Sequence, residues 1–180
     1  MEEVDLLIVG GGVVGLACAS AAARPGRTVC LLERPPRFGI ETSTHNSGVI
    51  HAGIYYPPGS LKATLSVEGR EALYRFCSRH EVPHRRCGKL IVAGPDDDAT
   101  GLEALHDRGV ANGVNDLEIL DEADLRRLEP RVRGSAALWS PSTGIVEAEA
   151  LVRALRYAAE DVEAALLPAS GLLEAGDGNN

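Results

Sequence analysis

A glycine-rich turn between two apolar segments constrains the fold of this chain more than any other feature. An apolar run over 4–9 leads into the glycine-rich stretch 10–15, and an alanine-rich segment over 13–23 follows. A second apolar run covers 28–32. Short apolar runs favour buried parallel strands, and a strand, glycine turn, helix and strand in about thirty residues make a βαβ unit. The sequence therefore predicts an α/β fold with a Rossmann-like core.

Gly10, Gly12 and Gly15 have the G-x-G-x-x-G spacing of a dinucleotide-binding loop. The first glycine of such a loop allows a tight turn, the second lets a pyrophosphate approach the backbone, and the third lets the helix pack closely on the strand. Val13 and Val14 open the following helix, whose free N–H groups and positive dipole end attract phosphates. We therefore predict nucleotide binding here; a purely structural glycine turn is the alternative.

Glu33 closes the second apolar run, where an acid of this fold binds the ribose hydroxyls. Its carboxylate disfavours NADP, because the 2′-phosphate would be repelled, but it does not separate FAD from NAD. The alternative is a solvated acid at the end of a strand.

Composition excludes several classes of partner. The formal net charge is −8 and the basic residues are dispersed, which argues against a nucleic-acid or anionic-membrane surface. The four cysteines include no C-x-x-C pair, and the histidines have no ligand-like spacing, so we predict no metal site. No signal peptide and no apolar run of transmembrane length is visible. We therefore expect a cytoplasmic protein without a transmembrane segment.

Beyond the βαβ unit, the pattern predicts further helices and strands. Helices are expected over 60–80, 100–108, 121–128 and 147–167, strands over 88–93, 117–120 and 136–140, and a turn over 94–98. Asp121 and Asp124 resemble a capping box at the start of the third helix. The apolar face of the helix over 60–80 is predicted to consist of Leu61, Leu65, Leu73 and Phe76. The small, polar tail 168–180 predicts a frayed end.

The segment 41–63 is dense in Ser, Asn, His, Gly, Tyr and Lys. It closely resembles the flavin-contacting loop of the L-2-hydroxyglutarate dehydrogenase/oxidase family, which belongs with D-amino-acid oxidase and glycine oxidase among the FAD-dependent oxidoreductases. The matching residues are Ser43, His45, Asn46, Ser47, Gly48, His51, Gly53, Tyr55, Tyr56, Pro58, Gly59 and Lys62. The resemblance continues through 88–93, 128–130 and 141–146, and covers the chain to about residue 155.

The resemblance implies FAD as the cofactor and a set of residues that bind it. These are Gly10, Gly12, Val13, Val14, Gly15, Glu33, Arg34, Ser43, His45, Asn46, Ser47 and Gly48. The chemistry of the residues agrees, because short Ser and Asn side chains suit phosphate and ribitol oxygens, and glycines let the backbone lie close to a flat ring. Turn formation by the same Ser and Asn residues is the alternative. For His45, covalent attachment to the flavin is a further alternative that the resemblance leaves open.

His51 is the candidate catalytic residue. Oxidation of a 2-hydroxy acid removes a hydride from the carbon and a proton from the hydroxyl, and an imidazole that titrates near neutral pH can take that proton. A histidine hydrogen-bonded within the loop is the alternative. Tyr55, Tyr56 and Lys62 are candidate substrate contacts, against the alternatives of aromatic packing and a solvated helix residue.

The resemblance implies oxidation of L-2-hydroxyglutarate, or a similar 2-hydroxy acid, to the 2-oxo acid. Electrons would pass to oxygen or to a quinone-linked acceptor, which would bring peripheral membrane association. An FAD-binding module without turnover, an FAD-dependent amine or amino-acid oxidase, and an NAD-linked dehydrogenase stay as alternatives.

We expect four regions along the chain. These are the first part of an FAD-binding domain over 1–83, part of a mixed α+β substrate domain over 84–146, a helix over 147–167 that returns to the FAD domain, and a flexible tail over 168–180. Family members have a later portion that completes the FAD domain and the substrate pocket. Without it, the sheet should expose an unpaired edge and apolar surface.

Overall fold

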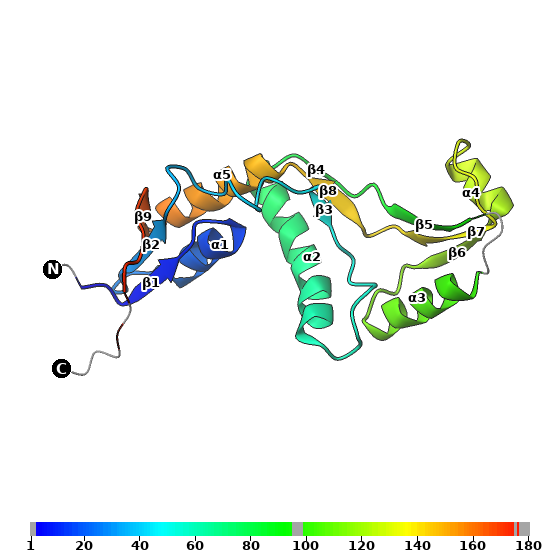
Figure 1. Ribbon diagram of the computed structural model, residues 1–180, viewed down its shortest axis with the longest axis horizontal. Coiled ribbons are helices and arrows are strands. Elements are labelled where there is room, and N and C mark those ends of the chain that lie inside the picture. Colours follow the sequence, from blue (N-terminus) through cyan, green and yellow to red (C-terminus); the bar gives the residue numbers. More distant parts are fainter. Residues whose placement is uncertain (1–2, 95–98, 175, 177–180) are drawn as a thin grey trace. The chain divides into compact units, whose positions relative to one another are not determined.

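The structure, a computed structural model, describes residues 3–94, 99–174 and 176 (Figure 1). The chain divides into two compact units. The first unit combines Met1–Ser47 with Glu147–Asn180, and the second unit is Gly48–Val146. The predicted turn over 94–98 lies, apart from Gly94, outside the described residues.

The first unit contains the predicted βαβ arrangement. Strand β1 (Leu6–Val9), helix α1 (Val13–Ala22) and strand β2 (Val29–Glu33) follow one another, and the two strands pair in parallel with Leu6 opposite Val29. Helix α1 packs against both strands. This confirms the α/β core, and the helix ends just before Pro25 and Gly26, residues that break helices.

The helix predicted over 147–167 is wrong in its second half. Helix α5 (Ala148–Glu160) ends early, and β9 (Ala165–Pro168) follows and pairs in parallel with β2. Glu163 ends the helix with a left-handed φ of 62°, while the Ala164 N–H donates to the Ala159 carbonyl in a helix-terminating pattern. Glycine usually holds this position, so the sequence carried no stop signal. The sheet order is β1-β2-β9.

The start of the tail is anchored, which corrects the frayed end expected from residue 168 onward. The N–H of Ala169 donates to the Pro35 carbonyl and that of Ser170 to the Glu33 carbonyl, both at 2.9 Å. These bonds continue the β2–β9 pairing past the end of the strands. Of the remaining tail, residue 175 and residues 177–180 lie outside the described residues.

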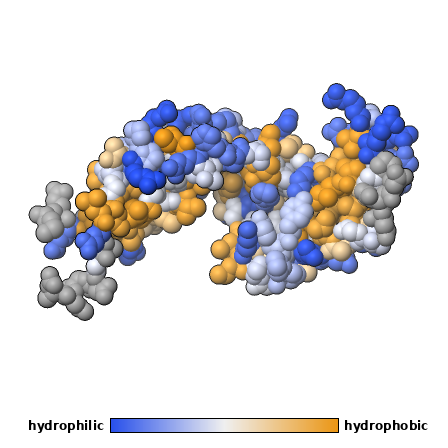
Figure 2. All heavy atoms as spheres, in the orientation of Figure 1, coloured by the Kyte–Doolittle hydropathy of each residue, from blue (hydrophilic) through white to orange (hydrophobic). Residues whose placement is uncertain are grey.

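One side of the first unit is apolar and open. Strand β1 stands at the end of the sheet order, and Leu7 and Val9 are 42% and 60% exposed. Figure 2 shows hydrophobic atoms gathered around β1 and α1. The open edge and apolar surface expected from the sequence are therefore present.

Within its described residues, the second unit holds three helices and two antiparallel sheets. The helices are α2 (Leu61–Arg79), α3 (Thr100–Ala111) and α4 (Glu122–Leu128). One sheet has the order β5 (Lys89–Ala93), β7 (Ala136–Ser140), β6 (Glu118–Asp121), and the other has the order β3 (Val49–Ile50), β8 (Gly144–Val146), β4 (His84–Arg85). The sequence predicted the three strands of the first sheet, though not their pairing, and none of the strands of the second. Helix α2 lies in this unit, whereas the sequence analysis grouped it with the FAD-binding region.

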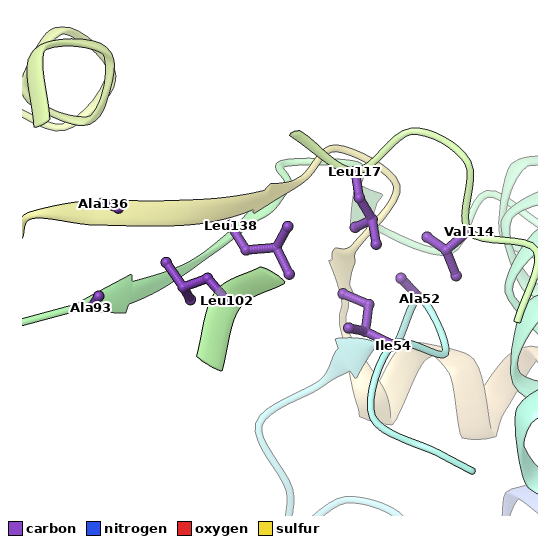
Figure 3. Close-up of a cluster of buried hydrophobic side chains, with 8 residues drawn as sticks. All are labelled: Ala52, Ile54, Ala93, Leu102, Val114, Leu117, Ala136 and Leu138. Atoms are coloured by element: carbon purple, nitrogen blue, oxygen red, sulfur yellow. The ribbon is translucent and has the colours of Figure 1, made fainter. Parts of the chain in front are cut away.

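A cluster of small and branched side chains forms the core of the second unit (Figure 3). Its members are Ala52, Ile54, Ala93, Leu102, Val114, Leu117, Ala136 and Leu138. They come from the loop after β3, from α3 and the loop that follows it, and from strands β5 and β7, so one face of the β5-β7-β6 sheet packs on α3 and on the loop that carries His51. Burial of this cluster fixes the base of the loop.

Helix α2 begins and ends where the sequence predicted, but it buries a different face. The Ser60 hydroxyl caps the helix by accepting from the Ala63 N–H at 3.2 Å. Leu61 and Leu65, which were expected to face the core, are 79% and 60% exposed. Ala63, Tyr74 and Cys77 are buried instead.

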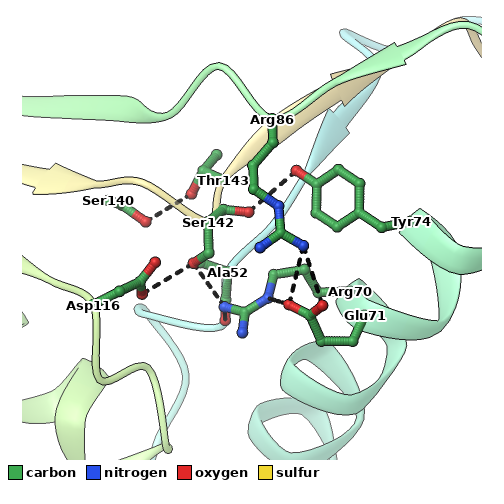
Figure 4. A network of polar contacts seen from close by, with 9 residues as sticks. All are labelled: Ala52, Arg70, Glu71, Tyr74, Arg86, Asp116, Ser140, Ser142 and Thr143. Atoms are coloured by element: carbon green, nitrogen blue, oxygen red, sulfur yellow. Dashed lines mark hydrogen bonds and ion pairs between the residues drawn. The ribbon is translucent and has the colours of Figure 1, made fainter.

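A buried arginine ties α2 to the loops around it (Figure 4). The Arg70 side chain is only 10% exposed, and its guanidinium donates to the Glu71 carboxylate at 3.0 Å, the Ser142 hydroxyl at 2.8 Å and the Ala52 carbonyl at 3.4 Å. The Ser142 hydroxyl in turn donates to Asp116. Because a buried charge needs such partners, the network fixes the loop that precedes α2.

We expect Arg70→Met to lower the free energy of unfolding by about 2 kcal/mol, since it removes charge-assisted hydrogen bonds and leaves polar partners unpaired. Urea unfolding followed by the fluorescence of Trp139, the single tryptophan, measures this within the same unit. Arg75→Met, at an exposed position of the same helix, is the matched control and should change stability by less than about 0.5 kcal/mol. Equal unfolding midpoints for the two variants would contradict the structural role of Arg70.

Candidate functional site

The glycine loop of the first unit has the geometry that its spacing predicted. Gly10 takes a φ of 106°, a conformation that favours glycine. A Cβ at Gly12 would lie 2.8 Å from the Ser43 hydroxyl, and a Cβ at Gly15 would lie 1.9 Å from the Gly10 carbonyl oxygen. The first glycine therefore makes the turn, the second leaves room beside it, and the third lets α1 approach the loop.

Two side chains from beyond the loop bind its backbone. The Glu33 carboxylate, at the end of β2, accepts from the Gly11 N–H. The Ser43 hydroxyl accepts from the Val13 N–H at 3.1 Å, at the first turn of α1. The predicted pair Glu33 and Ser43 thus lies at the mouth of the glycine loop, where helix N–H groups attract anions.

A cavity of about 410 Å³ opens beside this loop. Its walls come from the ends of β1 and β2, the segment 39–43 and the chain after β9. The lining residues are Val9, Gly10, Gly12, Leu32, Glu33, Arg34, Pro35, Gly39, Ile40, Glu41, Thr42, Ser43, Ser170, Gly171 and Leu172. Ser170, Gly171 and Leu172 escaped sequence analysis, because only the pairing of β9 with β2 brings them here.

The other predicted cofactor residues of the first unit are mostly exposed. Val14 is 74% exposed on α1, and the Arg34 side chain lies 3.9 Å from the Glu41 carboxylate at an exposed position. The His45 Nδ1 lies 2.8 Å from the Glu41 carbonyl oxygen, and the Asn46 amide donates to the carbonyls of residues 42 and 43. His45 and Asn46 therefore shape the loop locally, which is compatible with both alternatives, turn formation and cofactor contact.

The boundary between the two units falls within the predicted cofactor-binding residues, at the peptide bond between Ser47 and Gly48. Ser47 is the last residue of this part of the first unit, and Gly48 is the first of the second. Gly48 is buried, has a φ of 64°, and a Cβ there would lie 2.4 Å from the Val146 carbonyl oxygen. This position accommodates only glycine without rearrangement.

The loop after β3 in the second unit carries His51, Tyr55 and Tyr56, and Lys62 follows in the first turn of α2. The Lys62 ammonium lies 4.7 Å from the centre of the Tyr56 ring. The His51 side chain keeps contact with solvent, but partial burial and the positive charges of Lys89 and Lys62 hold its pKa below the ordinary value of 6.5. His51 is therefore neutral at neutral pH and can accept a proton.

No group of three or more His, Cys, Asp or Glu side chains is arranged to hold a metal ion in the part of the chain that the structure describes. Within the same residues, every helix is too short or too polar to cross a membrane.

A family model described as FAD dependent oxidoreductase matches residues 5–176. Among curated proteins, L-2-hydroxyglutarate dehydrogenase, mitochondrial, of Nematostella vectensis is 47% identical over 148 residues, which is 81% of this chain and 32% of that protein. The proteins of the same name from Caenorhabditis elegans and Homo sapiens are 48% and 43% identical; each match covers about four fifths of this chain, and 34% and 32% of those proteins. The chain thus spans about a third of the length of these relatives.

Among solved structures, L-alpha-glycerophosphate oxidase from Mycoplasma pneumoniae with FAD bound has a TM-score of 0.86 and 31% identity, over 94% of this chain and 45% of that one. Glycine oxidase from Geobacillus kaustophilus has a TM-score of 0.79 and 22% identity, over 94% and 47% of the two chains. The second likeness shows the fold alone.

Proposed function

Because the chain belongs to the FAD-dependent oxidoreductase family, we propose that its first unit binds FAD and that it serves the oxidation of L-2-hydroxyglutarate, or a similar 2-hydroxy acid, to the 2-oxo acid. The observation that carries FAD binding is the cavity beside the glycine loop, with Glu33 and the first turn of α1 at its mouth. The substrate rests on the identity to proteins named L-2-hydroxyglutarate dehydrogenase.

The residues around this cavity fit a dinucleotide. The glycines at 10 and 12 carry no side chain that would keep a pyrophosphate from the loop backbone, and the positive end of α1 adds to the attraction. Glu33 is placed to exchange its bond with Gly11 for one with the ribose hydroxyls. Arg34, His45, Asn46, Ser47 and Gly48 are proposed contacts along the path toward the flavin.

The reaction breaks a C–H and an O–H bond at the same carbon of the substrate. FAD, when bound, supplies the two-electron acceptor for the hydride that leaves the carbon. We assign the proton of the hydroxyl to the neutral imidazole of His51, whose lowered pKa keeps it unprotonated at neutral pH. Tyr55, Tyr56 and Lys62 are the proposed substrate contacts, and oxygen or a quinone-linked carrier is the proposed electron acceptor.

FAD binding without turnover is the second candidate. It is favoured by the open side of the first unit, where Leu7 and Val9 of β1 leave apolar surface exposed. The location in the cytoplasm, with or without peripheral membrane association, stays a prediction; the relatives carry the word mitochondrial in their names.

A flavin spectrum decides between these candidates. We expect the purified, desalted chain to show bound flavin and to lose its visible absorbance when L-2-hydroxyglutarate is added without oxygen. Bound flavin that no 2-hydroxy acid reduces would favour the module without turnover, and reduction by glycine or sarcosine would move the substrate class to amines. Folded protein that takes up no FAD would overturn the proposal.

A further inference from the structure

The chain has 18 basic residues besides histidine, yet only two of them, Lys62 and Lys89, are lysines. Both lysines act on the same group, because each contributes a positive charge that lowers the pKa of His51. Lys62 stands in the first turn of α2, and Lys89 is the first residue of β5. The fold of the second unit therefore brings the only two lysine side chains of the chain to one histidine.

Each lysine also faces a tyrosine of the His51 loop. The Lys89 ammonium donates to the Tyr55 hydroxyl at 2.7 Å and lies 4.4 Å from the centre of the Tyr55 ring. The Lys62 ammonium lies over the Tyr56 ring. Among the described residues, neither lysine forms an ion pair with a carboxylate, whereas the neighbouring Arg70 and Arg86 both bind Glu71. The two lysines thus keep positive charge that no described carboxylate neutralises.

We propose that Lys89 and Tyr55, together with Lys62, form a carboxylate-binding site beside His51 that selects a dianionic 2-hydroxy acid over a monoanionic one. The site rests on the proposed function, and it adds Lys89 as a residue that determines substrate class.

The chemistry of the Lys89–Tyr55 pair suits one carboxylate. An ammonium has three donors, and the bond to Tyr55 uses one of them. The Tyr55 hydroxyl accepts that bond and keeps its own proton for donation, so the pair offers a carboxylate two kinds of donor. Tyr55 is 40% exposed, which leaves the pair open to a ligand.

The second lysine explains the preference for two carboxylates. In a chain of net charge −8, a dianion meets overall repulsion, which two unneutralised ammonium groups offset locally. A single-carboxylate acid can use only one of them. Together with burial, the same charges favour the neutral form of the histidine.

The test uses the 180-residue chain without added flavin and follows the imidazole proton resonances by NMR as the pH is varied. His51→Gln identifies the His51 signal among the five histidines. We expect saturating glutarate to raise the pKa of His51, because the bound anion offsets the two lysines, and butyrate at equal concentration to do so much less. In Lys89→Met, the pKa without ligand should rise, and glutarate should bind about tenfold more weakly.

Two further variants separate the loss of a hydrogen-bond donor at the site from the loss of a charge far from it. Tyr55→Phe should leave the His51 titration without ligand close to that of the parent chain but weaken glutarate binding, because it removes a donor and keeps both charges. Arg75→Met removes one charge at an exposed position on α2, roughly 20 Å along the helix from Lys62. It should change neither the titration of His51 nor the affinity for glutarate. Thermal unfolding by circular dichroism checks that each variant is folded.

Glutarate affinity that Lys89→Met leaves unchanged, or equal responses to glutarate and butyrate, would overturn the site. These readouts need no flavin. Loss of the proposed oxidation with the glutarate response intact would therefore count against the function alone, and the reverse result against the site alone.

Discussion

Gly15→Ala should abolish or strongly weaken FAD binding by the first unit. The new Cβ would lie 1.9 Å from the Gly10 carbonyl oxygen, and both are backbone-fixed atoms that cannot rotate apart. The glycine loop or α1 has to move, and forcing extra volume into a packed contact costs about 1–3 kcal/mol. Because FAD needs the undistorted loop, this cost is subtracted from its binding free energy, and FAD affinity falls by about 10- to 100-fold. Titration of the apoprotein with FAD, followed by flavin fluorescence, measures the change.

Gly69→Ala is the matched control, because it makes the same chemical change within a helix. A Cβ at Gly69 in α2 meets no atom within 4 Å, so the substitution should add about 0.5–1 kcal/mol of stability through helix propensity and leave FAD affinity unchanged. A loss of FAD affinity in Gly15→Ala, beside unchanged affinity in Gly69→Ala, would show that close packing at residue 15, rather than glycine content, determines binding. Unchanged FAD affinity in Gly15→Ala would show that the loop tolerates a wider spacing.

The βαβ core was predictable because its determinants are local. The spacing of Gly10, Gly12 and Gly15 encodes a turn, a close approach of a pyrophosphate and a packing contact within six residues, and the structure contains the turn and the packing contact. The position of Glu33 followed from the length of the same unit, and its carboxylate does reach the glycine loop.

The features that could not be predicted from the sequence depend on contacts between distant segments. The strand β9 was hidden because Glu163 ends α5 in a left-handed conformation without glycine, and the leucines that follow suit a helix as well as a strand. The contribution of Ser170 to the cavity wall depends on that strand. The strands β3, β4 and β8 have only two or three residues each, too few for any periodic pattern.

The prediction of the buried face of α2 was wrong, and the role of Lys89 was missed, for a related reason. Hydrophobic spacing pointed to Leu61 and Leu65, but the helix buries other residues, such as Tyr74, whose hydroxyl donates to the Ser142 carbonyl. Lys89 lies far from His51 in sequence, and only the folded second unit brings its charge to the histidine. A chemically active cluster assembled from separate elements leaves no short motif.

His51→Gln should leave flavin content unchanged and slow the reduction of the flavin by L-2-hydroxyglutarate by about 10²- to 10⁴-fold, the range for loss of a general base. Glutamine can still form hydrogen bonds but cannot take up the hydroxyl proton at neutral pH. Anaerobic stopped-flow absorbance measures the rate of reduction. His106→Gln, on α3 beside Asp107, is the control and should reduce at the parent rate.

The pH dependence separates a proton acceptor from a residue that only orders the loop. Burial and the charges of Lys89 and Lys62 lower the pKa of His51 below 6.5, so the protonated, inactive form accumulates only in more acidic solution. At low substrate concentration, where the pH profile reports the pKa of the free protein, the parent rate should therefore stay level through neutral pH and fall with a midpoint below 6.5. His51→Gln should lose this acid limb together with its rate. A variant that is slow but keeps the acid limb would assign the proton to another group and leave His51 a structural role.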